Sequence, residues 1–363
     1  MPDSAKGKTQ TGATAPLPRR PIMRREIHES PERLAVLLQR ETPRTAKALS
    51  FLREQRPSLI FVAGRGTSHH AAIYGHYMFE HFLGIPVSGA ALSLHTLYPA
   101  PLHLKGALAI GLSQSGESVD VVKALRTARQ RGAFTVAITN APNSSLTQLA
   151  HHTIPLHARK ERAVAATKTY TAELAAIAMI CHALGGDLPE GEIQALPEAA
   201  AAALAHDAEI AHLVPYYRYA PRCLCLARGF NYATTREVAL KLMETCYLGS
   251  VGMSAADFLH GPIAFVDEDT PIMLFAPDGP TYSFMLGLAR KLRRQGVDIL
   301  TFTNRREIAA ASTLAVRASL KIREGLSPIP FTILGQLFAC HLAQVRGVNP
   351  DAPRRLSKVT HTL

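Results

Sequence analysis

The sequence is poor in cysteine and has no long hydrophobic run. Five cysteines occur among 363 residues and none forms a CxxC pair, which excludes a disulfide scaffold and a zinc ribbon. The longest nearly apolar run, residues 174–184, is too short to span a bilayer. No apolar core follows the N-terminal charges, so a signal peptide is excluded too. These absences predict a protein of the reducing cytoplasm, without a membrane segment.

Acidic residues are fewer than basic ones: 28 Asp and Glu stand against 40 Lys and Arg, a formal charge of +12. Such an excess suits nucleic acid, an acidic surface or phosphorylated small molecules. Residues 1–24 carry part of it in a stretch rich in Pro, Ser, Thr, Ala and Gly. This composition predicts a disordered basic tail, and favours a solubilising role over a nucleic-acid arm.

The body of the chain alternates strand-like and helix-like patterns, which predicts an α/β protein with parallel sheets flanked by helices. Four Gly or Asn landmarks in the first half recur in the second half at an offset of 163 or 164 residues. We therefore expect two tandem copies of one doubly wound unit. The expected strands cover residues 58–63, 107–112, 134–139, 222–227, 271–276 and 297–303.

The predicted organisation follows from this repeat. A first unit with an N-terminal helix occupies residues 25–187, a connector 188–215 and a second unit 216–350, and a terminal loop covers 351–363.

One strand end of the first copy has the chemistry of a phosphate site. The segment Ser113, Gln114, Ser115, Gly116, Glu117, Ser118 places hydroxyls, an amide and a glycine where a helix begins. Backbone N–H groups at a helix start lack partners and attract anions. A single cap needs only one or two such residues, so the pattern favours a phosphate loop.

Two other strand ends support one phosphate site per chain. The equivalent segment of the second copy, residues 276–280, has two prolines that remove donors and an aspartate that repels phosphate. Segment 64–68 (GRGTS) ends a neighbouring strand of the first copy and is expected to close around the same ligand. Neither loop is a P-loop, and His69 breaks the dinucleotide fingerprint.

These residues resemble the sugar isomerase (SIS) domains, and in particular the isomerase half of glutamine–fructose-6-phosphate aminotransferase. The resemblance covers roughly residues 23–363 and implies two tandem SIS units. It rests on segments 23–38, 66–68, 113–118, 139–145, 161–170, 239–247, 260–262 and 353–360.

The resemblance implies roles for four residues. Glu244 matches the base that moves a proton between C1 and C2 of the sugar. Lys241 lies three residues earlier, on the same helix face, where an ammonium keeps a carboxylate ionised. His260 matches a histidine that opens the sugar ring and is contributed by the neighbouring subunit, which implies a homodimer. Lys358 matches a lysine on a C-terminal loop that closes over the sugar.

Ligand contacts follow from the same resemblance, which implies neither a metal nor an organic cofactor. Ala166 departs from the family serine at its position, which removes one hydroxyl from the sugar site. The implied phosphate contacts are Ser68, Ser113, Gln114, Ser115 and Ser118, and the implied sugar contacts are Thr67, Val164 and Thr167.

The implied function is deamination and isomerisation of glucosamine 6-phosphate to fructose 6-phosphate and ammonia. The aminotransferase has an N-terminal glutaminase domain with a terminal cysteine nucleophile, whereas fewer than 30 residues precede the isomerase-like part here. We therefore expect the deaminating direction. The alternatives are a fructosamine-6-phosphate deglycase, an ammonia-dependent synthase and a non-catalytic sugar-phosphate sensor. Neither nucleic acid nor a membrane is expected as a partner.

Overall fold

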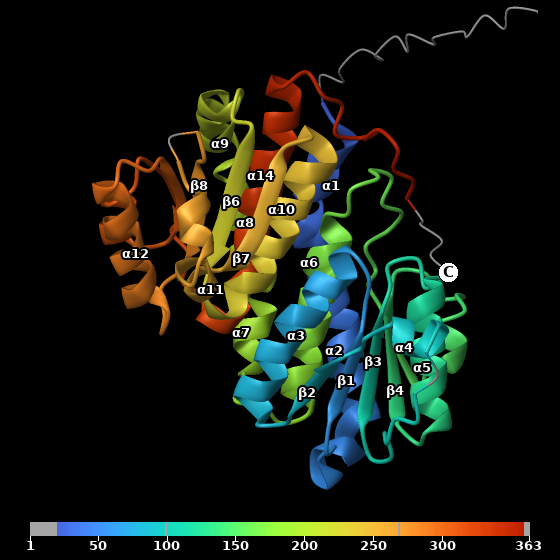
Figure 1. Cartoon of the computed structure of the whole chain (residues 1–363). Helices are drawn as coiled ribbons and strands as arrows, with labels where there is room; N and C mark the ends of the chain where they lie inside the picture. Colours follow the sequence, from blue (N-terminus) through green and yellow to red (C-terminus); the bar gives the residue numbers. More distant parts are fainter. Residues whose placement is uncertain (1–19, 99, 268, 359–363) are drawn as a thin grey trace, which may run out of the picture.

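The computed structural model describes residues 20–98, 100–267 and 269–358. Most of the predicted basic tail and the last residues of the predicted terminal loop therefore lie outside the described residues. Within the described part, the chain forms two five-stranded sheets with helices packed against them (Figure 1). Every strand pairing in both sheets is parallel, which confirms the predicted α/β class.

The two sheets share one topology, which confirms the predicted repeat. The order is β2-β1-β3-β4-β5 in the first sheet and β7-β6-β8-β9-β10 in the second. The strands are β1 Ile60–Ala63, β2 Val87–Gly89, β3 Leu108–Leu112, β4 Phe134–Thr139, β5 His152–Pro155, β6 Arg222–Ala227, β7 Gly249–Ser254, β8 Ile272–Ala276, β9 Ile299–Thr303 and β10 Leu314–Arg317.

The inner strands are the ones that the sequence predicted, because their apolar runs are buried on both faces. All residues of β3, β8 and β9 are buried, as expected for parallel strands covered by helices. The bounds of β4 and β6 match the prediction, and the others start one or two residues later. The partly exposed edge strands β2, β5, β7 and β10 were not predicted, since such strands carry a weaker apolar signal.

Four long helices, α3, α6, α10 and α14, lie between the two sheets (Figure 1). The helices are α1 Ile22–His28, α2 Ser30–Gln55, α3 Thr67–Leu83, α4 Ser93–Thr96, α5 Val119–Gln130, α6 Lys168–Ala183, α7 Glu190–Gln194, α8 Leu196–Leu204, α9 Asp207–Leu213, α10 Tyr232–Cys246, α11 Ala255–Leu259, α12 Tyr282–Arg294, α13 Arg306–Ala310 and α14 Pro328–Val345.

Helix α14 is long and apolar enough to cross a membrane by length and composition, but 89% of it is buried inside the protein. It packs on α8, α9 and α10, and a helix that is apolar all round is expected in such a central position. Its apolar stretch is longer than the run 174–184 that stood out in the sequence. We therefore treat α14 as a core helix.

The predicted end of the tail at residue 24 is wrong by a few residues. Helix α1 begins at Ile22, and Met23 is fully buried. The backbone N–H groups of both residues donate to the Asp351 carboxylate, at 2.8 and 2.7 Å. A carboxylate that caps a helix start anchors it, so the ordered chain begins before the predicted boundary.

Candidate active site

The first sheet reverses its strand order between β1 and β3, since β2 lies on one side of β1 and β3 on the other. Loops 64–68 and 113–118 follow these two neighbouring strands at the same edge of the sheet. Ligands of open α/β sheets bind in the crevice at such a switch point. A Cβ at Gly64 would come within 2.5 Å of the Ser68 carbonyl oxygen, so only glycine allows the tight turn of the first loop.

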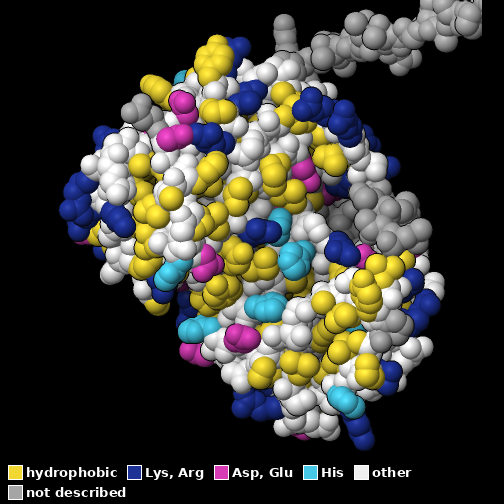
Figure 2. All heavy atoms as spheres, viewed as in Figure 1, with side chains coloured by type: hydrophobic (Ala, Val, Ile, Leu, Met, Phe, Trp, Pro, Cys, Tyr) yellow, Lys and Arg dark blue, Asp and Glu magenta, His cyan; other side chains and the backbone are white. Residues whose placement is uncertain are grey.

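A cavity of about 240 Å³ lies where these loops meet the second unit and the C-terminal segment. Its lining is Arg65, Gly66, Thr67, Ser68, Ser113, Gln114, Ser115, Ser118, Val164, Ala166, Lys241, Glu244, Leu356, Ser357 and Lys358. The structure thus brings together all the residues predicted for the site except Thr167 and His260. In the space-filling view, basic and histidine side chains gather midway between the two units (Figure 2).

The serine hydroxyls of loop 113–118 are arranged to donate. The Ser113 Oγ accepts the Gly116 N–H at 3.1 Å, and the Ser115 Oγ accepts the Glu117 N–H at 3.3 Å. A hydroxyl that accepts a backbone bond keeps its own hydrogen for another acceptor. Helix α5 begins directly after Ser118, so its N-terminal N–H groups add positive potential. The loop therefore offers an oxyanion several donors without bulk.

Gly116 makes this loop conformation possible. Its φ is +67°, and an added Cβ would lie 1.9 Å from the Ser144 Oγ. We expect Gly116→Ala to distort the loop and to weaken sugar-phosphate binding by roughly fivefold to a hundredfold, since overpacking costs about 1–3 kcal/mol. Calorimetric titration with glucitol 6-phosphate measures this loss. Gly287→Ala is the matched control, because nothing lies within 4 Å of its Cβ. Equal affinity of both variants would contradict the role given to the loop.

The second unit fills its equivalent loop with its own carboxylate. Thr281, just before α12, donates to Glu324 from its hydroxyl at 2.6 Å and from its N–H at 3.4 Å. A Cβ at Gly279 would lie 2.2 Å from the same carboxylate. The Glu324 carboxylate already occupies this loop, which is a further physical reason to expect only one phosphate site per chain.

Glu244 is held by a buried ammonium. The Lys241 Nζ lies 2.6 Å from the Glu244 Oε2 and 3.3 Å from a Glu237 oxygen, and it also donates to the Thr67 hydroxyl at 3.2 Å. Burial opposes the charge of Lys241, but Glu237 and Glu244 outweigh it and raise the pKa of the ammonium well above its ordinary value. Lys241 therefore fixes the carboxylate beside the cavity, and the predicted ion pair is confirmed as a contact.

Lys358 fastens the C-terminal segment over the cavity. Its Nζ donates to the Glu161 Oε2 at 2.7 Å and to the Ala163 carbonyl at 2.8 Å. Glu161 is fully buried, and although burial opposes it, the Lys358 ammonium together with hydrogen bonds from Thr167 and Thr169 lowers the pKa of its carboxyl. The lysine thus lies in the lining as a paired cation.

Thr167, a predicted sugar contact, does not line the cavity. Its side chain is fully buried, and both its N–H and its hydroxyl donate to Glu161, at 2.8 and 3.2 Å. The residue therefore shapes the start of α6 instead of facing the cavity. Ala166, which the sequence marked as a lost hydroxyl, does lie in the lining.

His260 lies outside the cavity of its own chain. It is exposed and follows the short helix α11. This position is compatible with a role in a neighbouring subunit, and that role stays a prediction.

Sequence reasoning missed three residues of the site. The Arg65 guanidinium lines the cavity and donates to the buried Asp120 at 2.6 and 2.9 Å. Glu237 contacts both Lys241 and His70. The His70 Nδ1 lies 2.8 Å from the Glu237 Oε2. The spacing of Glu237, four residues before Lys241, could have found it. No sequence signal connects His70 to this pair, because it lies in the other unit.

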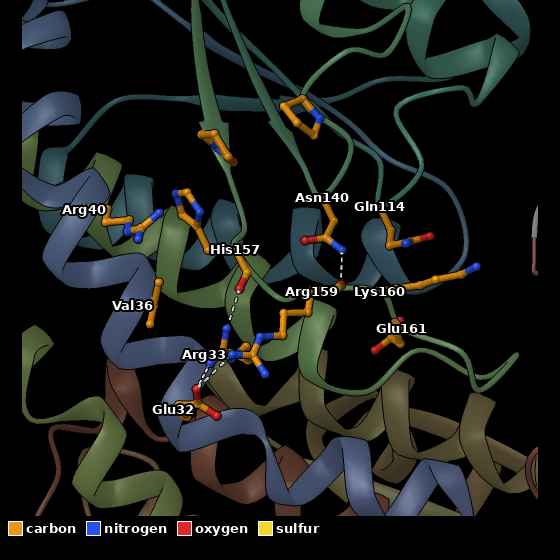
Figure 3. A pocket seen from close by; sticks show the side chains of 12 residues that line it. Glu32, Arg33, Val36, Arg40, Gln114, Asn140, His157, Arg159, Lys160 and Glu161 are labelled. Atoms are coloured by element: carbon orange, nitrogen blue, oxygen red, sulfur yellow. Dashed lines mark hydrogen bonds and ion pairs between the residues drawn. The ribbon is translucent and has the colours of Figure 1, made fainter.

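A second, larger cavity of about 870 Å³ adjoins the first at Gln114, which lines both. Figure 3 shows that basic side chains surround it. Arg33 donates to the His157 carbonyl at 3.5 Å, and Asn140 donates to the Arg159 carbonyl at 2.7 Å. None of the predicted catalytic residues lines this cavity, so the smaller cavity is the candidate active site.

Known proteins match both units of the chain. The family model described as SIS domain matches residues 35–183 and 216–346. The glutamine–fructose-6-phosphate aminotransferase (isomerizing) of Pyrococcus horikoshii is 33% identical over 347 residues, which are 93% of this chain and 57% of that protein. The chain thus spans little more than half the length of this curated relative.

Solved structures show the same fold. The C-terminal domain of glucosamine-fructose-6-phosphate aminotransferase from Francisella tularensis has a TM-score of 0.80 at 25% identity, covering 92% of this chain and 98% of that one. The glucosamine-6-phosphate deaminase of Thermotoga maritima has a TM-score of 0.78 at 19% identity, covering 94% and 100%. At that identity the second likeness shows the fold alone.

Proposed function

The chain belongs to the SIS domain family, and we propose that it converts glucosamine 6-phosphate to fructose 6-phosphate and ammonia by sugar-phosphate isomerase chemistry. One observation carries the proposal. A carboxylate held by a buried ammonium, Glu244, lines the same small cavity as the oxyanion loop 113–118. A base at a fixed distance from a phosphate anchor is what proton transfer within a phosphorylated sugar requires.

In the proposed mechanism, loop 113–118 and Ser68 hold the phosphate, and Thr67 and Val164 contact the sugar. Glu244 takes the proton from C2 of the open-chain aldehyde and returns it to C1. The C1 carbonyl becomes a hydroxyl and the C2 amine becomes an imine. Water adds to C2, and ammonia leaves to give the ketose. The phosphate supplies remote binding energy that orients the reacting carbons.

The size of the cavity supports an unsubstituted amino sugar phosphate as the substrate. The cavity volume of about 240 Å³ lies just below the range of roughly 300 to 1,000 Å³ that is usual for ligand sites. It therefore favours an unsubstituted hexosamine phosphate over a sugar that carries an amino acid.

The test is to mix the purified protein with glucosamine 6-phosphate, without glutamine, and to measure ammonia and fructose 6-phosphate together. Equal release of both supports the proposal. A parallel reaction from fructose 6-phosphate and ammonium detects the synthetic direction, and fructoselysine 6-phosphate detects a deglycase. Failure to release ammonia, while the sugar phosphate still raises the melting temperature, would contradict deamination and retain the binding site.

We further propose that His260 serves the cavity of a partner subunit in a homodimer, where it opens the sugar ring. Each of the variants His260→Ala and Glu244→Gln should be inactive alone. Coexpression forms mixed dimers in which one site has both wild-type residues, so about a quarter of the wild-type activity should return. Mixed dimers are confirmed by purification through two different tags. If they show no activity, His260 acts in the cavity of its own chain or has no catalytic role.

A further inference from the structure

A buried carboxyl group lies directly behind the phosphate cavity. The Ser68 hydroxyl, which lines the cavity, is 2.7 Å from the Glu173 Oε1. Glu173 belongs to α6 and is 1% exposed. Its second oxygen is buried and has no hydrogen-bond partner among the described residues. A charged carboxylate in such a position would carry a large uncompensated desolvation cost.

The groups around Glu173 add negative charge to its surroundings. Glu237 of α10 and Glu161, which precedes α6, both disfavour the ionised form of the Glu173 carboxyl. The basic groups that contact these two carboxylates are Lys241 and His70 at Glu237 and Lys358 at Glu161.

A buried phenol also lies near Glu173. Tyr170 of the same helix interacts with it electrostatically and, like Tyr74 of α3, is fully buried. Burial is the main cause that raises the pKa of Glu173 to about 8, against the opposing effect of the Ser68 hydrogen bond. Near neutral pH the group is therefore mostly a neutral acid.

The single hydrogen of the Ser68 hydroxyl makes this protonation state important for the ligand. When Glu173 is ionised it can only accept, so Ser68 donates to it and turns a lone pair toward the cavity. When Glu173 is protonated it can donate to the Ser68 oxygen. The serine hydrogen is then available to a phosphate oxygen.

We propose that Glu173, as a neutral carboxylic acid, is a positioning residue that directs the Ser68 hydroxyl toward the phosphate, and that phosphate binding above neutral pH takes up one proton at this carboxyl. The inference rests on the proposed sugar-phosphate site and adds a proton-linked control of its affinity. Glu173 does not touch the ligand and acts only through Ser68.

The expected pH dependence has a definite sign. Binding requires the protonated form, so affinity is full well below pH 8 and falls up to tenfold per pH unit above it. The phosphate group itself has a second pKa of about 6, so it stays a dianion throughout this range. Glu173→Gln keeps an N–H donor toward Ser68 at every pH. We expect the affinity of this variant for the sugar phosphate to equal that of the wild type at pH 7. At pH 9 its affinity should be about tenfold higher than that of the wild type.

Calorimetric titration with glucitol 6-phosphate, which has no carbonyl group and cannot react, tests the proposal at pH 7, 8 and 9. Pairs of buffers with different ionisation enthalpies report the protons taken up. At pH 9 the wild type should take up close to one proton and Glu173→Gln none. Ser68→Ala should bind more weakly at pH 7 but without proton uptake. Glu324→Gln, which replaces a buried carboxylate of the second unit, should show the pH profile and proton uptake of the wild type.

Two results would overturn the inference. Identical pH profiles and proton uptake in the wild type and Glu173→Gln, with unchanged melting temperatures, would remove the role of Glu173 and leave the proposed function intact. No binding of glucitol 6-phosphate to the wild type at any pH would overturn the phosphate site itself. Loss of deamination with binding and proton uptake preserved would instead refute only the proposed reaction.

Discussion

Glu244→Gln is expected to lower turnover of glucosamine 6-phosphate by about a hundredfold to ten-thousandfold while the protein still binds the sugar phosphate. An amide cannot take the C2 proton, and general-base catalysis contributes roughly 10²- to 10⁴-fold. The amide oxygen can still accept from Lys241, whose Nζ lies 2.6 Å from the carboxylate in the wild type. The fold and the phosphate loop should therefore persist.

Steady-state kinetics and exchange in deuterated water together measure this effect. The wild type should carry solvent deuterium into the sugar through the C2 proton transfer, and Glu244→Gln should not. Glu198→Gln applies the same chemical change to an exposed residue of α8 and should leave both readouts unchanged. Normal turnover in the Glu244 variant would remove this residue from the role of base.

The sequence predicted most of the cavity because its loops follow strands with strong apolar signals. Loops 64–68 and 113–118 end two neighbouring inner strands, so locating the strands also located the phosphate donors. Lys241 and Glu244 are three residues apart on one helix, and such local pairs are readable from spacing. For these residues the periodic pattern and the final geometry agree.

The remaining parts of the site depend on packing between distant segments. Thr167 was assigned to the sugar from its position in a motif, yet its N–H and hydroxyl both donate to the buried Glu161. Glu237 contacts His70 across 167 positions of sequence, and Glu173 contacts Ser68 across 105. Spacing along the chain fixes the face of a helix but not the partner that a distant segment places against it. Buried polar pairs between distant segments are therefore visible only in the structure.

Lys241→Met is expected to reduce both stability and activity, because it leaves two carboxylates without their shared cation. Lys241 is fully buried between Glu237 and Glu244. Removing one partner of a buried ion pair costs about 3–5 kcal/mol of unfolding free energy. Turnover should fall by at least about a hundredfold, since the base loses the group that orients it. Urea unfolding and kcat/KM measure the two losses separately.

The double variant Lys241→Met with Glu237→Gln separates structure from chemistry. Glu237 is fully buried, whereas the Glu244 side chain is 21% exposed and can be solvated. The double variant should therefore regain much of the lost stability but none of the activity. Recovery of turnover along with stability would mean that Lys241 serves only the fold. Because Lys241 also donates to Thr67 of the first unit, persistent inactivity would mean that the base is competent only when this lysine joins the two units at the cavity.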